Sequence, residues 1–208
     1  MSTTSNAGGS RDAGAWDHSE CTGMAGCPPR CPRFVDREGT PLLIGPGIDG
    51  AMAALVEFYD EYPARDRSMA LPPLTRPQVE SWVEKLAAQG RSILASHDGR
   101  LVGHVAYVRT DPDVADDQCE PELIVFVDSE YQNRGLGTEL CRQAMAHAAD
   151  DGHPALRLHV DADNERALAV YESLGFREVD RDGKRIEMRV ALDGELVETV
   201  QAPPAERP

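Results

Sequence analysis

The chain has 208 residues, a length that suits one domain with extensions or two very small domains. Hydrophobic residues make up 41%, which is enough for a core and excludes wholesale disorder. The formal net charge of −15 argues against nucleic acid and anionic membranes as main partners. So acidic a surface is typical of a protein from a halophilic organism, kept soluble in high salt, although ordinary solubility accounts for it as well.

Targeting signals and cysteine usage indicate the compartment. No run of 18 apolar residues is present for a membrane span, and residues 1–10 lack the apolar segment of a secretory signal. We therefore expect a cytoplasmic protein by default. Five cysteines, an odd number, do not suggest a disulfide framework in that compartment.

Residues 1–38 are rich in Gly, Ser and Asp, then in Pro and Cys, and show little apolar periodicity. We expect them to form an N-terminal extension that is partly disordered. The extension contains His18, Cys21, Cys27 and Cys31, which could hold a structural zinc ion in a tetrahedral site. Their spacing differs from the paired C-x2-C pattern of zinc ribbons, so unliganded thiols are the alternative.

The elements after this extension are expected from apolar periodicity and turn signals. In chain order they are a strand at 40–44, a helix at 48–62, a helix from Thr75 to Gly90, strands at 92–96 and 101–109, a strand at 123–127, a helix at 135–151, a strand at 155–160, a helix at 164–174 and a strand at 185–192. Asp98 and Gly99 predict a hairpin turn. Helices alternate with strands only in the second half, so the expected class is α/β, with a mixed sheet and packed helices.

A glycine-containing turn, QNRGLG at 132–137, joins the apolar strand at 123–127 to the next helix. Its glycines allow positive φ and close approach of a ligand to the backbone. The first N–H groups of the following helix have no internal partners and lie at the positive end of the helix dipole, so the turn suits a phosphate or pyrophosphate. It matches neither the P-loop nor the dinucleotide fingerprint, and a turn without a ligand is the alternative.

A second motif follows at 164–176, where Asn164, Leu168 and Tyr171 are spaced to share one helix face. A capped amphipathic helix with a core tyrosine is the simpler explanation of this segment alone. Together the two segments resemble the GNAT superfamily of acyl-CoA-dependent N-acetyltransferases. Its Q/R-x-x-G-x-G/A pattern is matched by Gln132, Gly135 and Gly137, and its N-x-x-A-x-x-x-Y-x-x-x-G-F pattern by Asn164, Ala167, Tyr171, Gly175 and Phe176. The resemblance covers 40–192 in element order and is specific over 122–177.

The resemblance implies a GNAT fold at 39–192: a mixed, mostly antiparallel sheet, splayed at its central strands, with helices on both faces and a C-terminal tail at 193–208. The splay would admit the pantetheine arm of acetyl-CoA, paired like an added strand. The amides from Gln132 through Thr138 would cradle the pyrophosphate, with Arg134 as a nearby cation. The implied cosubstrate-binding residues are Phe126, Val127, Gln132, Asn133, Arg134, Gly135, Leu136, Gly137, Thr138, Asn164 and Ala167.

The resemblance also implies direct attack of a primary amine on the acetyl group in a ternary complex. Tyr171 would protonate the departing thiolate, and the amine's proton needs a base, for which Glu122 is the choice and a merely solvated acid the alternative. The N–H of Val127 would donate to the acyl oxygen. His104 and His159 lie on strands and could face the acceptor cleft, although structural histidines are more frequent.

Several alternatives concern the whole protein. A non-catalytic acyl-CoA-binding sensor is the rival to an enzyme, because both would hold the same nucleotide. The acceptor stays open among protein N-termini, lysine side chains, polyamines, aminoglycosides and other small amines. A homodimer is also included among the predictions, since dimers formed through edge strands are common in such folds.

Overall fold

The computed structural model describes residues 17–47, 51–62, 73, 75–110, 113–115 and 118–207. The first 16 residues of the expected extension, and residues 48–50 at the start of an expected helix, lie outside the described residues. Within the described part, no helix has the length and apolar character needed to cross a membrane.

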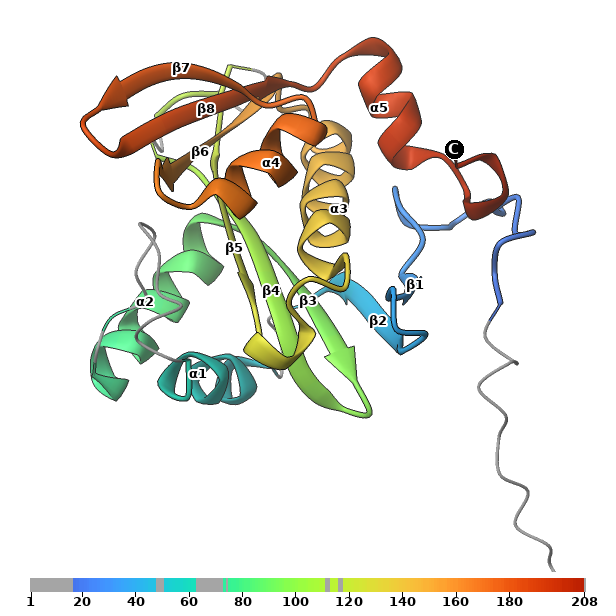
Figure 1. Ribbon diagram of the computed structural model, residues 1–208, viewed down its shortest axis with the longest axis horizontal. Coiled ribbons are helices and arrows are strands. Elements are labelled where there is room, and N and C mark those ends of the chain that lie inside the picture. Colours follow the sequence, from blue (N-terminus) through green and yellow to red (C-terminus); the bar gives the residue numbers. More distant parts are fainter. Residues whose placement is uncertain are drawn as a thin grey trace, which may run out of the picture.

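One eight-stranded sheet organises the molecule, in the order β1-β2-β3-β4-β5-β6-β8-β7 (Figure 1). The strands are β1 (Arg33–Val35), β2 (Pro41–Pro46), β3 (Gly90–His97), β4 (Arg100–Val108), β5 (Glu122–Val127), β6 (Ala155–Asp161), β7 (Arg177–Asp182) and β8 (Arg185–Ala191). Neighbouring strands are antiparallel except β5 and β6, which are parallel. The expected mixed, mostly antiparallel sheet is confirmed.

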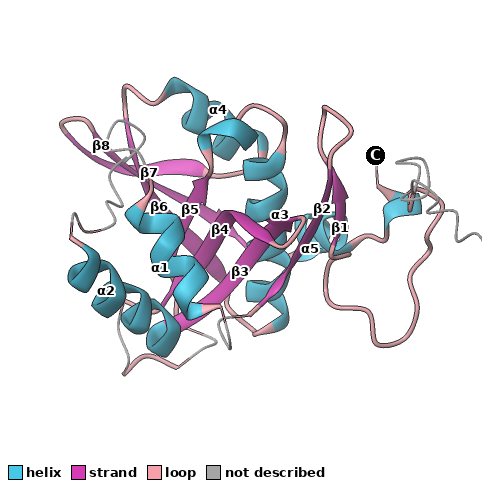
Figure 2. Cartoon of the chain, turned by 90° about the horizontal axis from the view of Figure 1, so that it is seen from below, coloured by secondary structure: helices cyan, strands magenta, loops and turns pink. Residues whose placement is uncertain are grey.

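Helices cover both faces of this sheet (Figure 2). They are α1 (Met52–Asp60), α2 (Arg76–Gln89), α3 (Leu136–Asp150), α4 (Glu165–Ser173) and α5 (Gly194–Gln201). Tyr59 of α1 and Val83 of α2 are fully buried in one apolar cluster, on one face. Leu140 and Met145 of α3 belong to a second, larger cluster on the opposite face, against which α4 and α5 also pack. The two clusters are separate because the sheet lies between them.

Local signals account well for the first half of the chain. Asp98 and Gly99 both have positive φ, at 49° and 81°, as a two-residue hairpin turn between β3 and β4 requires. Thr75 immediately precedes α2, and a proline lies in the helix's first turn. Gly90 ends α2 in an extended conformation, which lets the chain pass directly into β3.

The sheet parts between β5 and β6. Both strands are described in full, and they pair only at Glu122 with Arg157, at the start of β5, before they diverge. The carbonyl of Pro121 accepts from the N–H of Arg157, whereas the N–H of Asp128 donates to β4. Because backbone groups alternate sides along a strand, Val125 and Val127 present theirs to the gap and Phe126 presents its own to β4. The carbonyl of Val127 accepts from the side chains of Tyr62 and Gln132, so the groups open to an extended ligand chain are those of Val125 and the N–H of Val127.

Three elements have no counterpart among the expected ones. Every residue of β7 is exposed, so this strand lacks the apolar alternation that reveals a half-buried strand. β1 has three residues and lies inside the expected extension, paired with β2. α5 lies inside the expected tail and packs on α3 through the buried side chain of Val200. The formation of each of these elements depends on packing or strand pairing rather than on a local sequence signal.

The N-terminal segment is tied to α3 by a buried ion pair. Arg30 and Glu139 are each 3% exposed, and two guanidinium nitrogens of Arg30 lie 2.7 Å from the two carboxylate oxygens of Glu139. Arg30 also donates to the carbonyl of Val200 in α5. The segment before β1 is thus bound to both α3 and α5.

The predicted zinc site at His18, Cys21, Cys27 and Cys31 is not formed. The described residues contain no group of three or more His, Cys, Asp or Glu side chains that could hold a metal ion. The segment is instead fixed to the rest of the fold through its backbone carbonyls. The carbonyl of Cys21 accepts from the tail at Ala205, and that of Cys31 accepts from a side chain of α3, while the Cys21 and Cys27 side chains are exposed.

Candidate active site

A cleft of about 1160 Å³ opens where β5 and β6 part. Its walls come from β5, from the turn at 132–138 that leads into α3, and from the first turns of α4. The predicted site residues that line it are Phe126, Val127, Gln132, Asn133, Gly135, Gly137, Thr138, Asn164, Ala167 and Tyr171. The fold thus brings the two sequence motifs to opposite sides of one cleft.

The turn at 132–138 has the geometry of an anion-binding loop. Asn133 and Gly135 have positive φ, at 64° and 91°, and Gly135 is the residue from which α3 begins. The side-chain amide of Gln132 donates to the carbonyl of Val127 at 3.1 Å, which fixes the turn to the end of β5. The unpaired N–H groups of the first turn of α3 therefore lie beside the open edge of β5.

Arg134 and Leu136 do not line this cleft. The guanidinium of Arg134 lies 2.8 Å from a carboxylate oxygen of Glu38 and 3.7 Å from one of Asp36, so its charge is already balanced. Leu136 is buried in the larger apolar cluster. A different cation, Arg37, lines the cleft instead.

Arg37 comes from the turn between β1 and β2, which docks on the anion loop. Its backbone N–H donates to the carbonyl of Arg134 at 3.0 Å, and its Nε lies 3.7 Å from the position that a Cβ on Gly135 would take. Among the described residues its guanidinium has no ion-pair partner. The sequence carries no signal for this role, because Arg37 lies in the expected extension, about a hundred residues before the loop.

The side-chain amide of Asn164 has an oxygen that caps a helix and an NH₂ group that remains available as a donor. Its oxygen accepts from the N–H of Ala167 at 3.2 Å and so caps the start of α4. Because the oxygen is used in this way, the NH₂ group is the donor left for a molecule in the cleft. The capping role and the binding role expected for this residue are therefore compatible.

Tyr171 places a phenol in the cleft. Its ring packs on Phe176 at a centroid distance of 5.8 Å, and its hydroxyl has no hydrogen-bond partner within the described chain. Burial raises the pKa of Tyr171 well above its usual range, so the hydroxyl keeps its proton at neutral pH. The neighbouring thiol of Cys141 is also buried, which raises its pKa to about 12 and keeps it unreactive.

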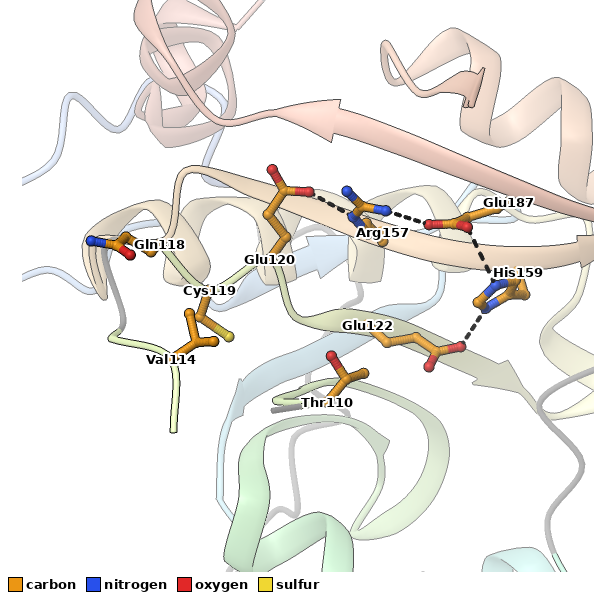
Figure 3. Close-up of a pocket in the computed structure, with 9 residues that line it drawn as sticks. All are labelled: Thr110, Val114, Gln118, Cys119, Glu120, Glu122, Arg157, His159 and Glu187. Carbon is orange, nitrogen blue, oxygen red and sulfur yellow. Dashed lines mark hydrogen bonds and ion pairs between the residues drawn. The ribbon is translucent and has the colours of Figure 1, made fainter. Parts of the chain in front are cut away.

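A second, polar pocket of about 530 Å³ adjoins the cleft along β5 and β6 (Figure 3). Its lining residues are Thr110, Val114, Gln118, Cys119, Glu120, Glu122, Arg157, His159 and Glu187. His159 lines the pocket and Asp161, two residues further along β6, lines the cleft. Two residues of a strand span about 6.6 Å, so the pocket and the cleft follow one another along β6.

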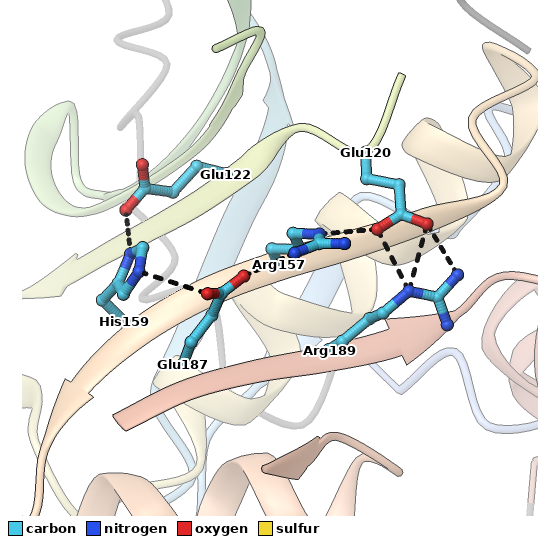
Figure 4. Close-up of polar contacts among 6 residues, drawn as sticks. All are labelled: Glu120, Glu122, Arg157, His159, Glu187 and Arg189. Carbon is cyan, nitrogen blue, oxygen red and sulfur yellow. Dashed lines mark hydrogen bonds and ion pairs between the residues drawn. The ribbon is translucent and has the colours of Figure 1, made fainter. Parts of the chain in front are cut away.

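Charged side chains form a connected row across this pocket (Figure 4). Arg157 and Arg189 are direct cross-strand neighbours on β6 and β8, where like charges repel. Glu120 lies between them and accepts from both, at 2.6 Å and 2.7 Å. Hydrogen bonds from Arg189 and then Arg157 lower the pKa of Glu120 to about 2, so it is fully ionised.

The row continues to the predicted base, Glu122. Arg157 donates to Glu187 at 2.6 Å, and His159 lies between Glu187 and Glu122. The Nδ1 atom of His159 is 2.8 Å from Oε1 of Glu122. The sequence places Glu122 at the start of the strand, but Glu187 is found only through the pairing of β6 with β8.

The other strand histidine, His104, has a structural position. It is fully buried beneath α1, and its Nδ1 is 2.5 Å from the hydroxyl of Tyr59. Burial lowers the pKa of His104 to about 3, so the imidazole is neutral at physiological pH. It lines neither the cleft nor the polar pocket.

Comparison with known families identifies the fold. The model of the family described as "Acetyltransferase (GNAT) family" matches residues 52–176, more than half of the chain. A mycothiol acetyltransferase of Nocardiopsis dassonvillei is 32% identical over 146 residues, which are 68% of this chain and 43% of that protein. One of Thermomonospora curvata is 38% identical over 107 residues, 51% of this chain and 33% of that protein. The chain therefore spans less than half the length of these relatives.

Solved structures share the same architecture. The GNAT domain of S. lividans PAT superposes with a TM-score of 0.67 at 19% identity, covering 76% of this chain and 95% of that one. The Salmonella typhimurium protein yncA, solved with its cofactor acetyl-CoA, superposes with a TM-score of 0.59 at 18% identity, covering 73% and 94%. At these identities the comparison supports the fold alone.

Proposed function

The chain belongs to the Acetyltransferase (GNAT) family, and we propose that it transfers an acetyl group from acetyl-CoA to a primary amine. The observation that carries this proposal is the cleft at the parting of β5 and β6, in which an open strand edge, an anion loop and the hydroxyl of Tyr171 face one another. These three features match the three parts of acetyl-CoA: an amide-containing arm, a pyrophosphate and a thioester.

The residues of the cleft fit acetyl-CoA as a cosubstrate. The backbone groups of Val125 would pair with the pantetheine arm, as an added strand pairs with a sheet edge. The NH₂ group of Asn164 would donate to a carbonyl of the arm. The amides at the start of α3 would hold the pyrophosphate. Gly137 lines the cleft at this point, where a Cβ would lie 3.7 Å from Cγ2 of Val127.

The cation next to the phosphates would be Arg37. Arg134 was the choice from the sequence, but its charge is balanced by Asp36 and Glu38. Arg37 has no such partner among the described residues and stands beside Gly135 at the start of α3. A guanidinium next to helix N–H groups makes a strong phosphate site.

Acetyl-CoA supplies an activated thioester, and the protein's side chains handle the protons. The amine nitrogen forms a bond to the acyl carbon, and the carbon–sulfur bond breaks. Glu122, which lines the polar pocket, takes the amine's proton, and Tyr171, whose hydroxyl stays protonated, gives one to the departing sulfur and then regains a proton from solvent. The N–H of Val127, which points to the gap, would donate to the acyl oxygen.

The acceptor would be a small, polar amine. The relatives are named for mycothiol, and the pocket next to the cleft is lined mainly by polar and charged side chains. Mycothiol lacking its acetyl group is therefore the first acceptor to test, followed by amino sugars and polyamines. Glu122 and Glu187 would favour a cationic amine over a neutral or acidic one.

A thiol-release assay across these amines tests the proposal. We expect thiol release that depends on both acetyl-CoA and amine. Binding of coenzyme A without turnover on any amine would favour the alternative, a non-catalytic acyl-CoA sensor. Absence of coenzyme A binding in calorimetry would overturn both.

The charge of the chain adds a condition to this assay. We propose that the net charge of −15 reflects a halophilic, cytoplasmic setting, since a dense acidic surface keeps a protein soluble in salt. Turnover that persists in molar KCl would support this, and turnover that falls steadily with added salt would count against it. A homodimer also stays a prediction, for which light scattering is the check.

A further inference from the structure

We propose that His159 is a positioning residue for Glu122. It binds one carboxylate oxygen of Glu122 and thereby directs the other, Oε2, toward the acceptor amine. This inference rests on the proposed function, because it gives the predicted base its orientation. It adds one residue, His159, that neither motif contains.

The positions of these residues follow from strand pairing. His159 and Glu187 are direct cross-strand neighbours on β6 and β8, so the sheet itself brings them together. Glu122 reaches them from β5, at the point where β5 and β6 begin to part. The result is an imidazole between two carboxylates, 2.8 Å from Glu122 and 4.0 Å from Glu187 (Figure 4).

This geometry determines where the imidazole carries its hydrogen. An ionised carboxylate can only accept a hydrogen bond, so Nδ1 of His159 must be the donor to Glu122. In the neutral ring Nε2 is then the unprotonated nitrogen, and at 4.0 Å from the Glu187 carboxylate it makes no hydrogen bond to it.

Glu187 is itself fixed by a hydrogen bond from a neighbouring side chain. One of its oxygens accepts from Arg157 at 2.6 Å, and Arg157 is fixed through Glu120 to Arg189. Three strands and the loop before β5 therefore contribute to one network. A catalytic group needs such support, because small errors in its placement lower the rate strongly.

The remaining oxygen of Glu122 is available to a substrate. Oε2 has no hydrogen-bond partner in the described part of the chain, and the side chain lines the polar pocket (Figure 3). With Oε1 bound to His159, only Oε2 can accept the amine's proton as the carbon–nitrogen bond forms. Glu122 then becomes neutral and later releases that proton to solvent.

The tautomer of His159 tests the inference without any acceptor. We would record imidazole ¹⁵N spectra of the full chain with coenzyme A bound, at alkaline pH, and assign the signals with His159→Gln. We expect Nδ1 to carry the hydrogen in the wild type, and Glu122→Gln to weaken this preference. A ring protonated at Nε2 in the wild type would overturn the proposal.

Kinetics supplies the second readout, with the amine that gives the fastest thiol release. We expect His159→Gln to lower kcat about 10- to 100-fold, less than the loss of a general base, with KM for acetyl-CoA within about twofold. Glu172→Gln, at an exposed acid outside both pockets, is the matched control. Equal kcat in His159→Gln and Glu172→Gln would overturn the positioning role. Failure of the proposed function would instead appear as absent thiol release in the wild type.

Discussion

The ion pair between Arg30 and Glu139 offers a quantitative prediction about stability. Replacing Arg30 by Met removes the guanidinium but keeps an apolar chain of similar length in the same space. The carboxylate of Glu139, 3% exposed, is then left charged and buried, with the side-chain amide of Gln143 as a donor at 3.3 Å. Breaking one side of a buried pair in this way costs roughly 3–5 kcal/mol in the free energy of unfolding.

That free energy corresponds to a large thermal shift. A chain of this size loses about 2–4 °C in Tm for each kcal/mol, so Arg30→Met should lower Tm by roughly 6–20 °C. Calorimetry and urea unfolding would measure it. The double variant Arg30→Met/Glu139→Met should regain most of the loss, because no uncompensated charge remains in the interior.

An exposed ion pair provides the control for this measurement. Arg100 lies 2.6 Å from Asp128, but its side chain is 55% exposed, so Arg100→Met should cost less than about 1 kcal/mol. If Arg30→Met costs no more than this control, the N-terminal segment is not held by a buried pair, and the argument is refuted.

Three further predictions concern the site and its charges. Tyr171→Phe should lower kcat about 100-fold and leave coenzyme A binding unchanged in calorimetry, and unaltered turnover would contradict its role as the acid. Arg37→Gln should weaken coenzyme A binding about 5- to 20-fold and Arg134→Gln less than twofold, whereas the reverse order would restore Arg134 as the phosphate ligand. Glu120 has a pKa of about 2 in the folded protein against an ordinary value of 4.5, so its stabilising effect is complete above pH 4.5 and lost as pH falls toward 2. The difference in unfolding free energy between wild type and Glu120→Gln should therefore shrink over that window, and a difference independent of pH would contradict the network.

Local sequence patterns predicted much of this protein because their causes are local. The turn at 132–137 shows its glycines, and the helix that begins after Asn164 shows its cap and apolar spacing, within a dozen residues each. Such patterns identified the helix that carries Tyr171 and the anion loop, which the fold then brings to one cleft. They could not reveal β7, whose residues are all exposed and therefore lack apolar alternation.

Contacts between residues distant in sequence position several side chains of the site, and local patterns do not reveal such contacts. Arg37 reaches the anion loop from a turn about a hundred residues earlier, and its neighbour Asp36 helps to balance the charge of Arg134. His159 meets Glu187 because β6 pairs with β8 across an intervening helix and strand. Neither contact follows from spacing along the chain.

Backbone conformation and side-chain environment differ in how far along the chain their causes lie. Backbone conformation depends largely on neighbours within a few residues, so the sequence by itself determined most strands and helices, the hairpin and the two motifs that line the cleft, but not β1, β7 or α5. The charge state and orientation of a side chain depend on whatever approaches it in space. Only the tertiary structure therefore decided that Arg37 rather than Arg134 faces the cleft, that the N-terminal cysteines stay apart, and that Glu122 is held by His159.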